Sequence, residues 1–124
     1  MLESAVSLEV PALPQYARSV RMMAANLAVL CSMSVDEVED ARMAAEEAFV
    51  LACATRPEGC TVGFTLGEGT LTMSFTLGAA DIDEADEQVS MSRLLLSYVC
   101  ESFEFADDGS TLVVDLVAEG VHAD

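Results

Sequence analysis

The chain has 124 residues, enough for one domain with a buried core, and 22 acidic side chains against five basic ones. Its formal net charge of −17 argues against nucleic-acid binding, which needs a basic surface, and disfavours a free nucleoside triphosphate. A basic protein partner is the natural counterpart, although acidity also keeps an aliphatic, Met-rich domain in solution.

No apolar run approaches the roughly 20 residues of a membrane span, and the opening residues MLES lack the features of a secretory signal. We therefore expect a cytoplasmic protein that does not bind a membrane. Its cysteines are widely spaced, and its only histidine is His122, so no metal site is predicted. We interpret all four cysteines as reduced, buried and structural: Cys31, Cys53, Cys60 and Cys100.

Residues 4–10 alternate apolar and polar side chains, which predicts a half-buried strand, and prolines at positions 11 and 14 end it. Residues 15–31 carry apolar side chains at helical spacing, which predicts an amphipathic helix. The expected inner face of this helix consists of Tyr16, Val20, Met23, Leu27 and Leu30.

A second helix is predicted to begin after Ser34, because Ser34 and Glu37 have the spacing of a capping box. It continues through an alanine-rich stretch, residues 41–54, that permits close packing against a sheet. The sequence Arg56-Pro57-Glu58-Gly59 ends it.

Two alternating segments, residues 60–66 and 71–77, predict a hairpin around a glycine-rich turn. An acidic loop, residues 78–87, precedes a third helix over residues 89–101. The expected inner side of that helix consists of Met91, Leu94, Leu95, Val99 and Phe103. Short strands over residues 102–105 and 111–117 follow, and residues 119–124 are predicted to form a flexible tail.

The predicted order is strand, helix, helix, strand, strand, helix, strand, strand. Strands joined by tight turns pair antiparallel, and a sheet with one polar face is covered by helices on the other. We therefore predict an α+β fold, a two-layer sandwich of a mostly antiparallel sheet with helices on one face. A single domain over residues 1–118 is expected.

Four stretches carry a resemblance to a known family: LEVPALPQYARSVRMMAANLA, SVDEVEDARMAAEEA, CTVGFTLGEGTLTMSFTL and SRLLLSYVCESFEFADDGSTLVVDLV. In their order and lengths they resemble the bacterial anti-sigma-factor serine kinases of the GHKL superfamily. The resemblance implies a histidine-kinase-like ATPase fold with a shortened lid. It also implies a sigma factor or an anti-sigma antagonist as the protein partner, and a homodimer.

The family's second helix carries a Glu-x-x-x-Asn pattern, in which the Glu is the general base and the Asn binds Mg²⁺. In this chain Glu47 matches the general base, but Leu51 replaces the Mg²⁺-binding Asn. In the other register Glu46 is followed by Val50. Neither aliphatic side chain can ligate a hard cation, which takes oxygen donors.

The family's other two nucleotide-binding boxes are also missing. The Asp that contacts adenine aligns with Gly78, which leaves Asp81, a few residues later, as the only candidate for nucleotide binding. The glycine loop that cradles phosphates aligns with residues 89–92, which contain no glycine. The resemblance therefore implies a degenerate member without ATP, Mg²⁺ or catalysis.

Three hypotheses follow. The first is a non-catalytic anti-sigma-factor-like regulator, in which Glu46 and Glu47 are acids on a partly solvated helix edge and Glu47 is a vestigial base. The second is an active ATP-dependent serine/threonine protein kinase that uses Glu47 and Asp81. The third is a small-molecule sensor that uses the vacated nucleotide pocket, unless Leu51 and Met91 fill it.

Two further patterns are interpreted as structural. The acidic segment 81–87 lacks the ligands of a calcium-binding EF-hand at Ala85, Asp86 and Ser92, so we interpret it as a solvated or partner-facing loop. Ser90 and Ser92, near the start of the third helix, are interpreted as N-caps.

Overall fold

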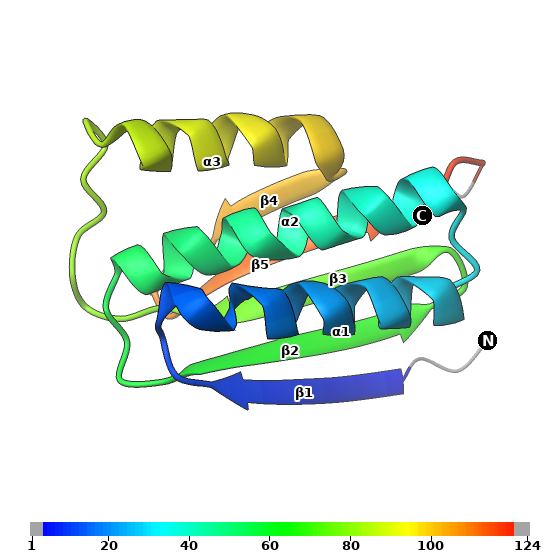
Figure 1. Cartoon of the computed structure of the whole chain (residues 1–124), viewed down its shortest axis with the longest axis horizontal. Coiled ribbons are helices and arrows are strands. Elements are labelled where there is room, and N and C mark those ends of the chain that lie inside the picture. Colours follow the sequence, from blue (N-terminus) through cyan, green and yellow to red (C-terminus); the bar gives the residue numbers. More distant parts are fainter. Residues whose placement is uncertain (1–3, 121–124) are drawn as a thin grey trace.

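Each strand that the alternating pattern predicts is present in the computed structural model, which describes residues 4–120 (Figure 1). The sheet order is β1-β2-β3-β5-β4, and each neighbouring pair is antiparallel. Gly69 takes a φ of +72° in the β2–β3 turn, a conformation that glycine adopts at little cost. The strands are β1 (Ser4–Val10), β2 (Cys60–Gly67), β3 (Thr70–Thr76), β4 (Ser102–Phe105) and β5 (Thr111–Val117).

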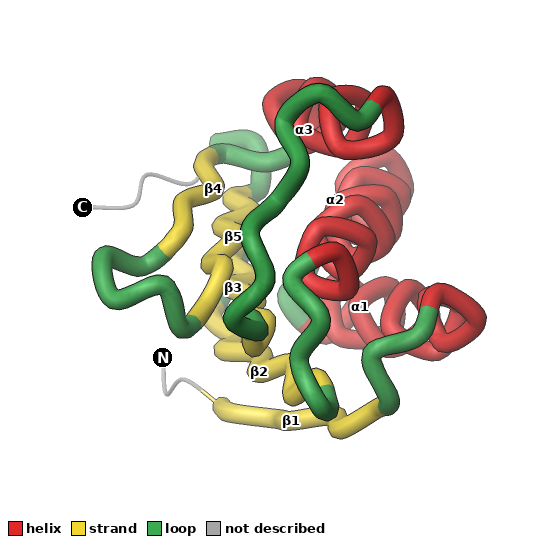
Figure 2. The backbone as a smooth tube through the Cα atoms, turned by 90° about the vertical axis from the view of Figure 1, so that its left-hand side faces the viewer, coloured by secondary structure: helices red, strands yellow, loops and turns green. Residues whose placement is uncertain are grey.

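The helices form a second layer on one face of the sheet, as the view in Figure 2 shows. A 3₁₀ turn, η1 (Pro14–Tyr16), leads into α1 (Ala17–Leu30), followed by α2 (Val35–Ala54) and α3 (Glu87–Val99). Helix α2 lies between α1 and α3 and packs against both (Figure 1). The predicted α+β class, with an antiparallel sheet and helices on one face, is confirmed.

The start of α2 has the predicted cap. The Ser34 hydroxyl accepts the Glu37 N–H at 3.2 Å, and the Glu37 carboxylate accepts the Ser34 N–H at 2.7 Å. These two bonds satisfy backbone donors that the first turn of a helix leaves without partners. The bond from the Ser34 N–H lowers the pKa of the Glu37 carboxyl, and a bond from the Glu119 N–H lowers it further.

The core lies between the two layers, and α2 contributes more buried residues to it than either of the other helices. The alanines of α2 are small enough to let the helix axis approach the sheet closely. The largest fully buried side chains come from both layers: Phe49, Phe64, Phe75, Leu51, Leu71, Met73, Leu96, Leu112, Val20, Val62, Val114 and Cys31.

The inner face of α1 differs from the prediction at one position. Leu30 is 65% exposed, whereas Ala24 and Ala28 are fully buried beside Val20 and Leu27. Close packing against the alanine-rich helix α2 favours small side chains on the contact face, so the large leucine at the end of α1 lies outside.

The inner face of α3 was predicted only in part: Val99 packs against the core, as does Phe103, which belongs to β4. Val89, Ser92 and Leu96 are buried, whereas Met91 and Leu94 are 53% and 50% exposed. Helix α3 carries two apolar stripes, and the periodic pattern alone does not say which one packs against the protein. Met91 therefore does not fill a vacated pocket, and Ser92 is not an N-cap.

The last described residues lie against the start of α2. The Glu119 N–H donates to the Glu37 carboxylate at 2.6 Å, so residue 119 is attached to the start of α2. The rest of the predicted tail, residues 121–124 with His122, lies outside the described residues. Across residues 4–120, no helix is both long enough and apolar enough to cross a bilayer.

Candidate functional site

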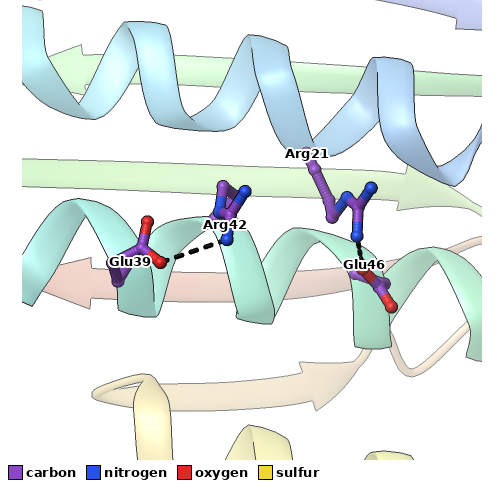
Figure 3. A network of polar contacts seen from close by, with 4 residues as sticks. All are labelled: Arg21, Glu39, Arg42 and Glu46. Carbon is purple, nitrogen blue, oxygen red and sulfur yellow. Dashed lines mark hydrogen bonds and ion pairs between the residues drawn. The ribbon is translucent and has the colours of Figure 1, made fainter.

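The two adjacent acids on α2 each hold a different neighbouring helix. Glu46 Oε1 accepts a hydrogen bond from Arg21 of α1 at 2.6 Å, with both side chains about one-third exposed (Figure 3). Glu47 Oε1 accepts the hydroxyl of Ser92 from α3 at 2.7 Å. The half-buried positions fit the predicted helix edge, but these partners were not predicted. The pair connects all three helices.

Glu47 is the residue that matches the general base of the resembling family. Its carboxylate already accepts a hydrogen bond from the Ser92 hydroxyl. Ser92 is only 1% exposed. The Ser92–Glu47 hydrogen bond therefore forms at the buried interface between α2 and α3. A general base must reach the proton of a substrate, directly or through one water. In this arrangement the nearest hydroxyl belongs to the protein itself, and α3 covers the approach from that side.

Leu51 lies one helical turn after Glu47, on the same side of α2. Its side chain is fully buried, and it ranks among the largest in the core. The position that would present a metal-binding oxygen in the resembling family therefore contributes to the hydrophobic core. Val50, in the other register, is half-buried and lines a shallow hollow with Ala12 and Pro14.

The loop after β3 lies tightly against the end of α2. Thr55 is 4% exposed, and its Oγ1 donates to the Ala52 carbonyl at 2.6 Å and accepts the Gly78 N–H at 2.7 Å. The Thr55 carbonyl accepts the Ala80 N–H at 3.0 Å. Thr55 therefore fixes the start of this loop through two hydrogen bonds, from the Gly78 and Ala80 N–H groups.

Gly78 permits this close approach because it has no side chain. A Cβ atom at this position would overlap the Thr55 carbonyl oxygen and lie 2.5 Å from both Arg56 C and Pro57 N. Real Cβ atoms do not approach backbone atoms this closely. The position that aligns with the adenine-contacting Asp therefore has no room for any side chain in this fold.

Asp81, the other candidate for nucleotide binding, is exposed and lines an open groove of about 570 Å³. Arg93, Phe105 and Asp108 line the same groove. Glu47 lines a different hollow, and the two share no lining residue. The structure thus does not bring Glu47 and Asp81 into one site.

The start of α3 is capped by a carboxylate. Asp86 Oδ1 accepts the N–H groups of Gln88 and Val89 at 2.8 and 3.2 Å. In a phosphate-binding loop such N–H groups bind the anion. Here Asp86 already occupies them, and Asp83 and Glu87 add negative charge nearby. This helix start disfavours phosphate.

The acidic segment, residues 81–87, forms hydrogen bonds within itself and an ion pair with α3. Asp83 accepts the Ala85 N–H at 3.0 Å, and Glu84 pairs with Arg93 at 2.7 Å. No group of three or more His, Cys, Asp or Glu residues is arranged for a metal ion within residues 4–120.

The cysteines are unpaired, as predicted, but only two are fully buried. Cys31 and Cys60 are buried, whereas Cys53 and Cys100 are half-buried. Burial raises the pKa of both half-buried thiols to about 11, with nearby acids and Cys60 adding smaller effects. At neutral pH they are protonated, so they are poor nucleophiles and poor metal ligands.

Sequence reasoning missed three residues that organise this region: Arg21, Thr55 and Ser92. Ser92 had one usable signal, because it is a polar residue in the same stripe as Val89 and Leu96. A polar residue in such a stripe needs a buried partner. Its partner, Glu47, lies 45 positions earlier, and no local pattern identifies it.

A comparison with models of known protein families found no match, and a search of curated proteins found no similar sequence.

Proposed function

We propose that this chain is a non-catalytic regulator of the anti-sigma-factor kind, which retains a histidine-kinase-like ATPase fold and acts by binding a protein. The order of the strands and helices supports the relation in fold. The main support for a non-catalytic role is the contact between α2 and α3. There Glu47 is bonded to Ser92, and Leu51 belongs to the core.

The charge of the chain and its exposed side chains support a protein partner. A net charge of −17 suits a basic protein and repels nucleic acid. Large apolar side chains are exposed on the outer faces of all three helices, including Met22, Val29, Met43, Leu94 and Tyr98. The proposed partner is a sigma factor or an anti-sigma antagonist in the cytoplasm.

The active-kinase alternative requires Glu47 and Asp81 to act on one nucleotide. They line separate hollows, and Asp86 occupies the N–H groups at the start of α3. These observations favour the non-catalytic proposal over the kinase.

Titration with Mg²⁺-ATP tests the absence of a nucleotide site. We expect no binding heat by calorimetry and no change in melting temperature at 1 mM nucleotide. A site with a dissociation constant of about 10 μM would stabilise the protein by about 2.7 kcal/mol at that concentration, an upward shift of several degrees. A 1:1 isotherm in the micromolar range would contradict the proposal and favour the kinase.

Purification of the tagged chain from its native cells tests the regulatory part. We expect a stoichiometric complex that contains a sigma factor or its antagonist, identified by mass spectrometry. A charge-matched unrelated acidic protein, purified in parallel, controls for nonspecific capture of basic proteins. Recovery of neither class of partner above this control would contradict the anti-sigma assignment.

A further inference from the structure

Helix α3 presents an apolar stripe to solvent. Met91, Leu94, Leu95 and Tyr98 follow the i, i+3, i+4, i+7 spacing of one helix face. Tyr98 is 78% exposed, and Leu95 is half-buried. The sequence pattern assigned Met91, Leu94 and Leu95 of this stripe to the core, and no described element covers it.

An acidic groove runs beside the stripe, between α2 and α3. Glu37, Asp40 and Glu47 lie at i, i+3 and i+10 of α2, so they share the helix side that faces α3. Asp40 joins two hollows of this groove. One, of about 190 Å³, also contains Tyr98 and Glu101, and the other, of about 210 Å³, contains Glu47 and Leu95.

Four carboxylates of the groove form no ion pair with an arginine of the described residues: Glu37, Asp40, Glu47 and Glu101. Within residues 4–120 the ion pairs are Arg21–Glu46, Arg42–Glu39 and Arg93–Glu84. The first two pairs line the same hollow as Asp40 and Glu47, so two of its four carboxylates are neutralised and two are not. Figure 3 shows Arg21 and Arg42 beside Glu46 and Glu39, on the side of α2 that faces α1.

The carboxyl group of Asp40 is affected by its burial in the groove and by the acids around it. Partial burial raises the pKa of its carboxyl, and the charges of Asp36 and Glu37 raise it further. A cation in the groove would reverse these unfavourable interactions.

We propose that the α2–α3 groove is a docking site for a basic amphipathic helix of a partner protein. The apolar face of that helix covers the α3 stripe, and its Lys or Arg side chains enter the groove beside Asp40 and Glu101. Helical partners recognise such grooves through apolar anchors at i, i+3, i+4 and i+7. A second copy of this chain fits less well, because it would bring another charge of −17 to an acidic surface. The inference deepens the proposed function and rests on it for the regulatory role of the partner.

The test uses two synthetic 18-residue helical peptides, with leucines at i, i+3, i+4 and i+7 and either Lys or Glu at the flanking positions. Each is titrated into the full-length, ¹⁵N-labelled protein at 150 mM salt, where long-range attraction is largely screened. We expect saturable binding of the Lys peptide, with amide shifts concentrated on α3 and the facing side of α2. The Glu peptide should not bind.

Matched variants separate a specific site from general charge attraction. Asp40→Asn with Glu101→Gln removes two groove acids, and Glu58→Gln with Glu104→Gln removes two exposed acids elsewhere. We expect at least tenfold weaker binding for the first pair and less than twofold for the second. Tyr98→Ala, at an exposed position, should also weaken binding at least tenfold.

Three results would overturn the inference: no saturable binding of the Lys peptide, shifts concentrated on the sheet, or equal weakening by the two charge-matched pairs. Sedimentation that shows a dimer dissociated by Tyr98→Ala would assign the stripe to a second copy and overturn it as well. A sigma-factor complex that the Asp40 and Glu101 substitutions leave intact would overturn the site but not the proposed function. Groove-specific peptide binding without any sigma-factor complex would overturn only the proposed function.

Discussion

Replacement of Leu51 by asparagine is expected to destabilise the protein by about 4 kcal/mol or more. Removal of a buried leucine costs about 2–5 kcal/mol, and an unpaired buried amide adds about 1–3 kcal/mol. Leu51 is fully buried in α2, so both costs apply. Urea denaturation followed by circular dichroism measures the change in the free energy of unfolding.

Two substitutions control this experiment. Leu51→Met conserves volume and should cost less than about 1.5 kcal/mol. Val50→Asn places the same amide one residue earlier, where the side chain is half-buried and water can reach it, so its cost should be much smaller.

The Leu51→Asn variant also tests the lost nucleotide site. It restores the Glu-x-x-x-Asn spacing from Glu47, yet we expect no stabilisation by Mg²⁺-ATP. A variant that kept wild-type stability and bound Mg²⁺-ATP would show that α2 still faces a nucleotide pocket, and it would contradict the proposed function.

Gly78→Ala is expected to destabilise the protein by about 3 kcal/mol, because overpacking against rigid backbone is costly. The added Cβ would overlap the Thr55 carbonyl oxygen, and the loop could escape only by breaking the Gly78–Thr55 hydrogen bond. Amide exchange should show faster opening at Gly78 and Ala80. Gly78→Asp should be at least as damaging and should not create an adenine contact.

Gly59→Ala is the matched control. A Cβ at position 59 would have the Val10 carbonyl oxygen as its nearest neighbour, at 3.9 Å. The change should be within about 1 kcal/mol, because the added methyl also restricts the unfolded chain. Equal effects at positions 59 and 78 would show that the close approach at Gly78 does not constrain the loop.

The capping box at Ser34 and the strand alternation were predictable because each depends on residues close in sequence. The inner face of α3 was not, since Met91, Leu94, Leu95 and Tyr98 form as regular a stripe as the buried residues. Helical periodicity reports that an apolar face exists, and the other helices determine which face is buried.

For the candidate site, too, the sequence predicts some features and the tertiary structure is needed for others. The replacement of a metal-binding Asn by Leu51 and the missing side chain at Gly78 are visible in the sequence as soon as the resemblance is considered. The complete burial of Leu51 and the overlap that a Cβ at Gly78 would make are not visible there, because both depend on how distant parts of the chain pack together.

The sequence by itself determined the secondary structure, the α+β class and the strongly acidic surface, all of which arise from local patterns and composition. Only the tertiary structure decided what Glu46 and Glu47 do. Two adjacent residues on a helix point about 100° apart, so packing on both sides of α2 gave one acid to Arg21 of α1 and the other to Ser92 of α3. It also left an apolar stripe and an acidic groove at the surface, because α3 turns Val89, Ser92 and Leu96 toward the interior.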